Sequence, residues 1–146
     1  MSTTALKVVL DVNILVAIIG KASPFRWVFD CIIDGRISLC VTTEILLEYR
    51  EILEQKNGTE VAENVLNLIA ILPFTETAIV FFNFHLITKD EDDNKYVDCA
   101  VASNVVCLVS NDRHFQEIKK KPFPSVQLLT LMEFEEKYKG TLITNN

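Results

Sequence analysis

The sequence predicts an α/β protein in which helices cover both faces of a mostly parallel central sheet. Short segments rich in β-branched residues alternate with longer segments of helical periodicity, which is the order expected of a parallel sheet. The first segment, residues 6–10, ends in Val-Val-Leu, as is typical of a central strand buried on both faces. Hydrophobic residues make up 49% of the 146 residues, enough to bury the core of a single domain.

The first half of the chain has distinct element boundaries. Gly20 ends the first short helix, and Ser23 and Pro24 mark the start of the next one, because Ser caps helices and Pro is tolerated at the first helical position. Thr42 or Thr43 is expected to cap a longer helix. The elements expected here are a strand at 6–10, helices at 13–19 and 24–34, a strand at 37–41, and helices from 43 to about 55 and from 59 to 71.

The second half follows from the same signals, except that residues 74–87 have an ambiguous pattern. Their β-branched and aromatic residues favour a strand near 78–82. The remaining elements expected are a helix at 93–103, a strand at 105–109, a short helix at 112–119, a strand at 126–129 and a helix at 130–138. We therefore expect one domain at 1–140 and a flexible tail at 141–146.

Composition and charge exclude several classes of protein. Twenty acidic and fourteen basic residues give a net charge of −6, so the chain lacks the basic footprint of a duplex-binding module. This balance is compatible with hydrolysis of a nucleic acid held by a metal ion. No apolar run reaches the roughly 18 residues that a membrane span requires, and the first residues do not resemble a signal peptide. The protein is therefore expected to be soluble and cytoplasmic, with no membrane partner.

A mean hydropathy of +0.25 is high for a soluble chain of this size. It suggests apolar surface that a partner would cover, so we expect a homodimer with residues 44–71 as the candidate interface. The four cysteines form no CxxC pair and have no histidines at zinc spacing. All four lie within apolar stretches, and we expect them to be buried thiols.

Two aspartates follow predicted strands directly. Asp11 comes after the strand at 6–10, and Asp112 comes shortly after the strand at 105–109. Ligands bind outside the carboxyl ends of parallel strands, and acids gathered there repel one another unless a cation lies among them. Each aspartate could instead cap the following helix, but Asn13 can cap the first helix and leave Asp11 free. The two acids together favour a metal site.

Two carboxylates on predicted helices are further candidates. On the helix at 93–103, Asp93 lies in line with the apolar stripe, whereas Asp98 lies about 140° from it and closer to solvent. The alternative for Asp93 is an acid stabilised by the helix dipole. Among the acids of the helix at 43–55, Glu48 lies nearest the apolar face, and its alternative is an exposed ion pair with a base one turn away.

Other polar groups have a simpler interpretation. Asp90, Glu91 and Asp92 are expected to form a solvated loop. His114 has no serine or cysteine placed as a partner nucleophile, so a surface position is expected, at most near a site. The basic run at 119–121 is a solvated helix end or a contact to a phosphate backbone.

Four segments carry a resemblance to a known family: Val8-Val-Leu-Asp-Val-Asn-Ile-Leu-Val16, Thr42-Thr-Glu-Ile-Leu-Leu-Glu-Tyr49, Asp92-Asp-Asn-Lys-Tyr-Val-Asp-Cys-Ala100 and Leu108-Val-Ser-Asn-Asp112. They resemble the ordered acidic motifs of the PIN-domain family, in particular the VapC-like toxins of toxin–antitoxin systems. The resemblance covers about residues 6 to 135. It implies a three-layer α/β/α sandwich, Mg²⁺ or Mn²⁺ as cofactor, endoribonuclease activity on RNA and a cognate antitoxin partner.

The resemblance also implies roles for particular residues. It assigns the metal-binding and catalytic acids to Asp11, Glu48, Asp93 and Asp112. Positions that accompany these acids in the family, or are often acidic there, make up a second tier: Asn13, Ser110 and Asp98. Val12 stands where many relatives have Thr, which removes a hydroxyl but no ligand. Such a site hydrolyses a phosphodiester with metal-activated water, and Glu48 would position a second ion or the attacking water.

Two other functions fit parts of the sequence. A non-catalytic member of the same fold would bind RNA or a protein without hydrolysing it. A phospho-acceptor receiver domain also gathers acids at strand ends, but it needs an acceptor aspartate after a mid-chain strand. The sequence has no aspartate between Glu60 and Asp90, which argues against the receiver domain.

Overall fold

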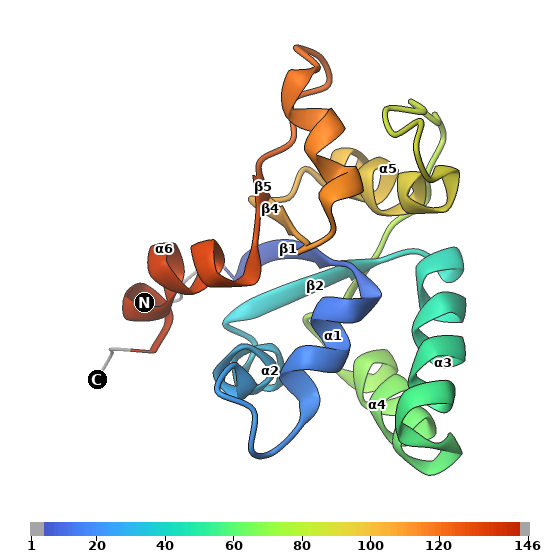
Figure 1. The fold of residues 1–146 in the computed structure, drawn as a ribbon. Coiled ribbons are helices and arrows are strands. Elements are labelled where there is room, and N and C mark those ends of the chain that lie inside the picture. The colour runs from blue at the N-terminus through green and yellow to red at the C-terminus, as the bar shows by residue number, and fades with distance from the viewer. Residues whose placement is uncertain (1–4, 144–146) are drawn as a thin grey trace.

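The computed structural model describes residues 5–143. Within this range five parallel strands form one sheet in the order β3-β2-β1-β4-β5, with helices on both faces (Figure 1). The strands are β1 (Leu6–Leu10), β2 (Ile37–Val41), β3 (Glu76–Thr77), β4 (Cys107–Val109) and β5 (Leu128–Leu129). The predicted fold class, an α/β sandwich with a parallel sheet, is confirmed.

The chain starts in the middle of this sheet. From β1 it moves outward through β2 to β3, and it then returns to the other side of β1 to form β4 and β5. Val8 of β1 is aligned with Leu39 of β2 on one side and with Cys107 of β4 on the other. The strand order therefore reverses between β1 and β4. In open parallel sheets such a switch point leaves a crevice outside the carboxyl ends of the two strands.

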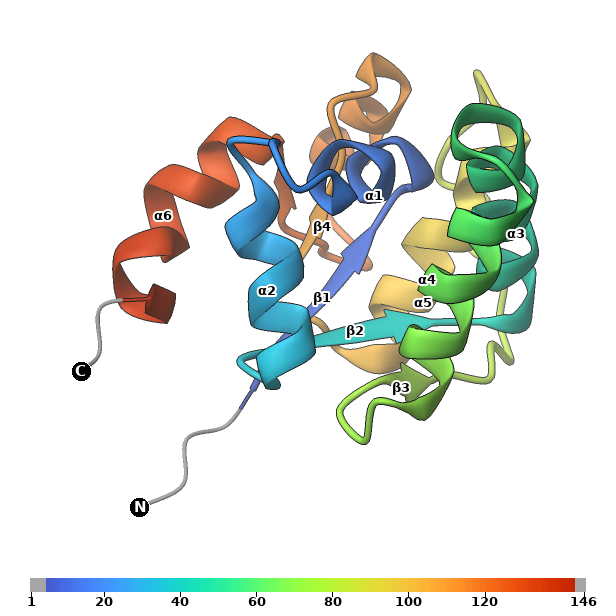
Figure 2. The ribbon, with the colours of Figure 1, turned by 90° about the horizontal axis from the view of Figure 1, so that it is seen from below.

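The helices form the outer layers of the sandwich. Figures 1 and 2 show α1 and α2 on one face of the sheet, α5 on the other, and α3 and α4 packed side by side near the end of β2. The α-helices are α1 (Val12–Ile19), α2 (Arg26–Asp34), α3 (Thr43–Asn57), α4 (Thr59–Ile71), α5 (Asn94–Ser103) and α6 (Leu131–Ile143), and the 3₁₀ helices are η1 (Glu91–Asp93) and η2 (Arg113–Lys120).

The core is continuous between the layers. Residues 8–10 of β1 and 39–41 of β2 are almost completely buried, as expected of central strands. Trp27 of α2 stacks on Phe134 of α6 with ring centroids 5.9 Å apart, which fixes the last helix to the sandwich. The four cysteines are buried and free, as predicted, and burial raises the pKa of each thiol. Within residues 5–143, every helix is too short or too polar to cross a bilayer.

The strand predicted near 78–82 is wrong. The short strand β3 ends at Thr77, and residues 78–90 have no regular secondary structure. The physical reason is the length of the neighbouring strand: the backbone N–H of Ala78 donates to Val41, the last residue of β2, and the chain has no strand to pair with beyond it. The segment therefore leaves the sheet, and Phe81 is left 91% exposed.

Other boundaries differ by a few residues. Helix α2 begins at Arg26 and not at Pro24, and the segment predicted as a short helix at 112–119 is the 3₁₀ helix η2. Helix α6 continues to Ile143, so residues 141–143 of the predicted tail are helical, while 144–146 lie outside the described residues. The domain limit at residue 140 stays a prediction.

Candidate metal centre

Asp11 lies at the switch point of the sheet, immediately after β1. Its carboxylate is buried and caps α1, because Oδ1 accepts a hydrogen bond from the backbone N–H of Ile14 (3.0 Å). The expectation that Asn13 caps this helix is wrong: Asn13 is exposed on the first turn. The second oxygen of Asp11 accepts a hydrogen bond from the Ser110 hydroxyl. Burial raises the pKa of Asp11, and these hydrogen bonds oppose the increase.

Ser110 connects the ends of the two central strands. It follows β4 and is buried, and its Oγ accepts a hydrogen bond from the backbone N–H of Asp112 (3.0 Å) while its hydroxyl donates to Asp11. Asp112 in turn caps η2 by accepting from the backbone N–H of His114 (2.9 Å). The polar residues expected at this edge, Asp11, Ser110 and Asp112, are thus brought together by hydrogen bonds through the Ser110 hydroxyl.

Asp93 approaches the same place from the other side, at the end of η1 and the start of α5. Its side chain is 16% exposed. Burial and, after it, the negative charges of Asp90, Asp112 and Asp11 together raise the pKa of Asp93 to about 7, while His114 opposes this increase. Asp93 was predicted to face the buried side of its helix, and it does lie among the acids of the switch point.

His114 is the group that sequence analysis missed. Its Nδ1 lies 3.5 Å from an oxygen of Asp112, 3.7 Å from one of Asp93 and 3.9 Å from one of Asp90. Within the described residues, His114 Nδ1 and Asp93 Oδ2 are buried atoms that have no hydrogen-bond partner. Buried polar atoms without partners are costly, so their convergence on one point fits a metal ion between them.

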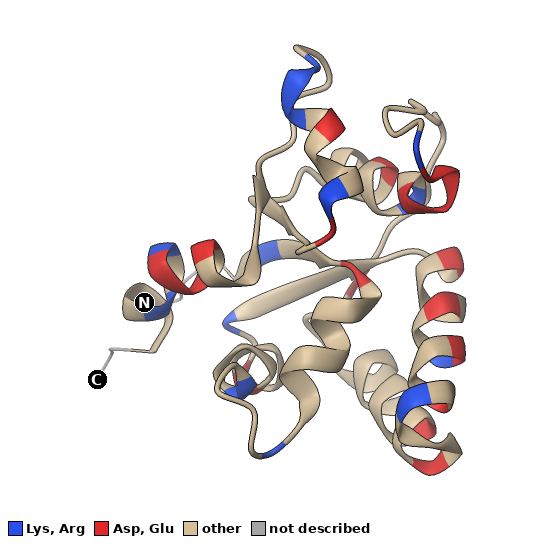
Figure 3. Cartoon of the chain, viewed as in Figure 1, with Lys and Arg blue, Asp and Glu red and all other residues tan. Residues whose placement is uncertain are grey.

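Asp90 is the second missed residue. It was expected in a solvated loop, but ligand atoms of Asp90, Asp93 and His114 all lie within 4.8 Å of one another, close enough to hold one ion. Figure 3 shows acidic segments in the η1 turn and beside the ends of the central strands. The signal for His114 was its place two residues after Asp112. Asp112 caps η2 by accepting a hydrogen bond from the backbone N–H of His114, and this cap keeps the two residues close together.

Glu48 lies on α3 and is held by two residues of α5. It accepts a hydrogen bond from the Tyr96 hydroxyl, and its Oε1 lies 3.3 Å from Lys95 Nζ. Glu48 is not one of the acids whose ligand atoms gather around His114. Glu48, the second of the four predicted acids, therefore lies outside the group of Asp90, Asp93 and His114 and already has a basic partner.

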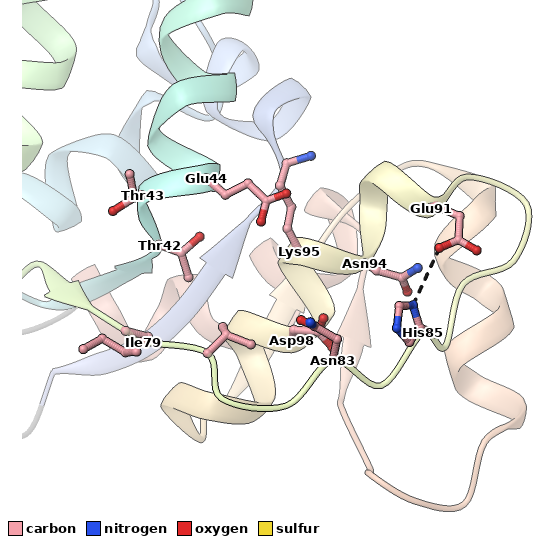
Figure 4. A pocket seen from close by; sticks show the side chains of 12 residues that line it. Thr42, Thr43, Glu44, Ile79, Asn83, His85, Glu91, Asn94, Lys95 and Asp98 are labelled. Carbon is pink, nitrogen blue, oxygen red and sulfur yellow. Dashed lines mark ion pairs between the residues drawn. The ribbon is translucent and has the colours of Figure 1, made fainter.

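Asp98 is not near solvent, contrary to the prediction. It is 5% exposed, and its carboxylate accepts a hydrogen bond from the backbone N–H of Phe84 (3.1 Å). The irregular segment at 78–90 folds over this part of α5 and covers Asp98, which the helix periodicity could not predict. Figure 4 shows Asp98 beside Asn83 in a cavity of about 440 Å³ between this segment and the start of α3.

Comparison with known proteins decides the family. A family model described as PIN domain matches residues 7–114. The chain belongs to the PIN domain family. No curated protein has a significantly similar sequence.

Solved structures share the fold of this PIN domain. One chain in the crystal structure of VapBC2 from Rickettsia felis, bound to a DNA fragment from their promoter, is 17% identical, with a TM-score of 0.60 and coverage of 86% of this chain and 98% of that one. DNA-bound VapBC from Salmonella typhimurium gives 17% identity, a TM-score of 0.52 and the same two coverages. These likenesses show that the PIN domain is built like chains of VapBC complexes.

The pKa of Asp93 predicts how the stability of the metal-free PIN domain depends on pH. Because its pKa is raised from 3.8 to about 7, the folded protein binds this proton more tightly than the unfolded chain does. In chelator, the free energy of unfolding should therefore fall as pH rises from about 4 to 7, by up to about 4 kcal/mol from this group. Urea melts across this range measure the slope.

Two variants isolate the contribution of Asp93 to that slope. Asp11 and Asp98 also have raised pKa values and act in the same direction, so wild type and variant must be compared. Asp93→Asn should flatten the slope, while Asp92→Asn, an exposed neighbour, should keep it. An unchanged slope in Asp93→Asn would show that this carboxylate titrates near its ordinary value.

Proposed function

We propose that this PIN domain is a divalent-metal-dependent endoribonuclease and the toxin of a toxin–antitoxin pair. One observation carries the proposal: side chains from the η1 turn and from η2, those of Asp90, Asp93 and His114, converge and leave Asp93 Oδ2 and His114 Nδ1 buried without hydrogen-bond partners among the described residues. Hard divalent ions take carboxylate oxygens as ligands, and Mn²⁺ also accepts an imidazole nitrogen. Family membership supports the same chemistry.

The residues of the cluster would have different roles in binding the metal ion. Asp90, Asp93, Asp112 and His114 would hold the ion, and Asp11 would contribute a lone pair that its two hydrogen bonds leave free. The two hydrogen bonds of the Ser110 hydroxyl would hold Asp11 and Asp112 in fixed positions, so that these ligands need not move when the ion binds. A bound Mg²⁺ or Mn²⁺ supplies a Lewis acid for the phosphate and lowers the pKa of an attacking water.

RNA would reach this centre past η2. This 3₁₀ helix, which carries His114, ends in Lys119 and Lys120, and Lys121 follows it directly; all three lysines are exposed. Exposed lysines can contact a phosphate backbone without reading its sequence. Their position supports the interpretation of the basic run as a contact to the substrate.

A cleavage assay tests the enzymatic part of the proposal. The purified protein is incubated with tRNA, rRNA and generic single-stranded RNA in Mg²⁺, Mn²⁺ or EDTA. We expect cleavage of at least one RNA with metal and none in EDTA. A protein that binds these RNAs but cleaves none of them under any metal condition would instead be a non-catalytic PIN domain.

The partner is tested separately in cells. Expression of the chain should arrest growth, and co-expression of a small DNA-binding protein encoded beside it should restore growth by forming a complex. Leu47 of α3 and Ile71 of α4 expose apolar side chains that such a partner, or a second copy of the chain, would cover. Arrest that persists with the neighbouring gene product would argue against an antitoxin partner.

A further inference from the structure

Lys95 is buried beside the acidic cluster and is fixed there by three contacts. Its Nζ lies 3.3 Å from Glu48 Oε1, donates to the backbone carbonyl of Asp92 (2.6 Å) and sits 5.2 Å from the centre of the Tyr96 ring. Its side chain is 7% exposed, against 32% for Lys7 and 40% for Lys139, which also form ion pairs. A lysine side chain is rarely buried to this degree unless it is paired, and here these contacts hold the amino group in one place.

The contacts of Lys95 place its charge between Glu48 and the aspartates. The carbonyl that it bonds belongs to Asp92 in η1, the turn that ends in Asp93. Its carboxylate partner, Glu48, comes from α3 on the opposite side, and Figure 4 shows the lysine side chain extending from α5 toward that helix. The ammonium group therefore lies between Glu48 and the η1 turn that carries Asp93.

We infer that Lys95 takes the place of a second metal ion, so that this PIN domain binds one divalent ion per chain. The inference rests on the proposed function, because it concerns the ion of the same site. In two-metal nucleases two ions lie about 4 Å apart and share the charge of the transferred phosphate. A second ion held by Glu48 would here have to displace an ammonium group or bind against its charge.

A fixed lysine can do part of the work of that ion. It is a compact positive charge with three donors, and it can hold a phosphate oxygen without any requirement for coordination geometry. Glu48 then has a different role from the one expected of it: it positions Lys95, and the Tyr96 hydroxyl positions Glu48. Loss of Glu48 should lower the affinity of the single ion by no more than about 100-fold, because the loss of an outer-shell partner typically costs about 10 to 100-fold.

Counting bound Mn²⁺ tests this inference without measuring activity. Electron paramagnetic resonance of free Mn²⁺, or titration calorimetry, gives the number of ions per chain. Wild type and Lys95→Arg, which keeps the charge, should bind one ion. Lys95→Gln should bind a second, weaker ion at Glu48. Lys139→Gln is the matched control, since Lys139 also pairs with a glutamate on its helix (3.5 Å) and lies over an aromatic ring, and it should bind one ion.

The outcomes separate this inference from the proposed function. Two ions in wild type, or one ion in a folded Lys95→Gln, would overturn the role of Lys95 and leave the nuclease proposal intact. If Lys95→Gln does not fold, Glu48→Gln decides: a loss of ion affinity as large as that of Asp93→Asn would make Glu48 a direct ligand and overturn the inference. No bound ion in wild type would overturn the proposed function and this inference with it.

Discussion

Asp93→Asn is expected to lower the rate of metal-dependent RNA cleavage by at least about 100-fold, because loss of a direct metal ligand should cost more than the 10 to 100-fold typical of outer-shell partners. The same substitution should raise Tm in chelator, since a carboxylate surrounded by Asp90, Asp112 and Asp11 is replaced by a neutral amide. Cleavage of a labelled RNA and a thermal melt, made on the same preparation, measure both effects. Loss of activity together with higher stability is the pattern of a functional residue.

Asp98→Asn is the matched control for this experiment. Asp98 lies in α5, the helix that directly follows Asp93, and is buried, but its carboxylate bonds to the backbone of Phe84 and does not lie in the cluster. An amide oxygen can accept the same hydrogen bond, so cleavage should stay near the wild-type rate. Equal losses in the two variants, or a larger loss in Asp98→Asn, would mean that the wrong aspartate of this helix has been assigned to the metal.

Phe115→Ala is expected to destabilise the protein by about 3 to 5 kcal/mol, the range typical of removing a buried aromatic side chain. Phe115 follows His114 on η2, is fully buried and packs edge-on against Tyr96 of α5 with ring centroids 6.2 Å apart. The ring therefore anchors η2 to the helix that carries Lys95. Loss of the ring should also weaken Mn²⁺ binding in the protein that remains folded, because the contact between Phe115 and Tyr96 holds His114 and Asp112 in position. Chemical denaturation and metal titration measure the two effects.

Phe81→Ala provides the comparison for Phe115→Ala. The same substitution at a side chain that is 91% exposed should change the free energy of unfolding by less than about 0.5 kcal/mol. If the two variants lose a similar amount of stability, Phe81 contributes to the folding of the segment at 78–90 more than its exposed side chain indicates. If Phe115→Ala loses stability but keeps full metal affinity, η2 does not depend on this anchor to position the site.

The order of strands and helices could be predicted because it depends on local signals. The strand at 37–41, the helix at 59–71 and the Thr42 cap all appear as expected, since β-branched runs, capping residues and glycines act within a few residues. The strand expected at 78–82 failed because a strand needs a partner. Its β-branched and aromatic content was suitable, but β2 ends at Val41, and nothing in the local sequence reports the length of a neighbouring strand.

The proximity of Asp11 and Asp112 could be predicted for a different reason, the parallel pairing of the strands that they follow. Asp11 and Asp112 follow adjacent parallel strands, and parallel strands bring their carboxyl ends together whatever lies between them. His114 and Lys95 were not predictable as members of the site. The position of His114 depends on the cap that Asp112 provides to η2, and that of Lys95 depends on the packing of α5 against α3.

The chemistry of the RNA ends tests the central claim most directly. If water bound to a metal ion attacks the phosphodiester, the products carry linear phosphate monoesters, and a substrate with a 2′-deoxy sugar at the cleaved position is still cut. Mass spectrometry of the fragments, with Mn²⁺ and with EDTA, gives both results in one experiment. We predict linear ends, cleavage of the 2′-deoxy substrate and no products in EDTA. Products ending in 2′,3′-cyclic phosphate that persist in EDTA would contradict the metal centre and would point to His114 as a base that activates the 2′-hydroxyl.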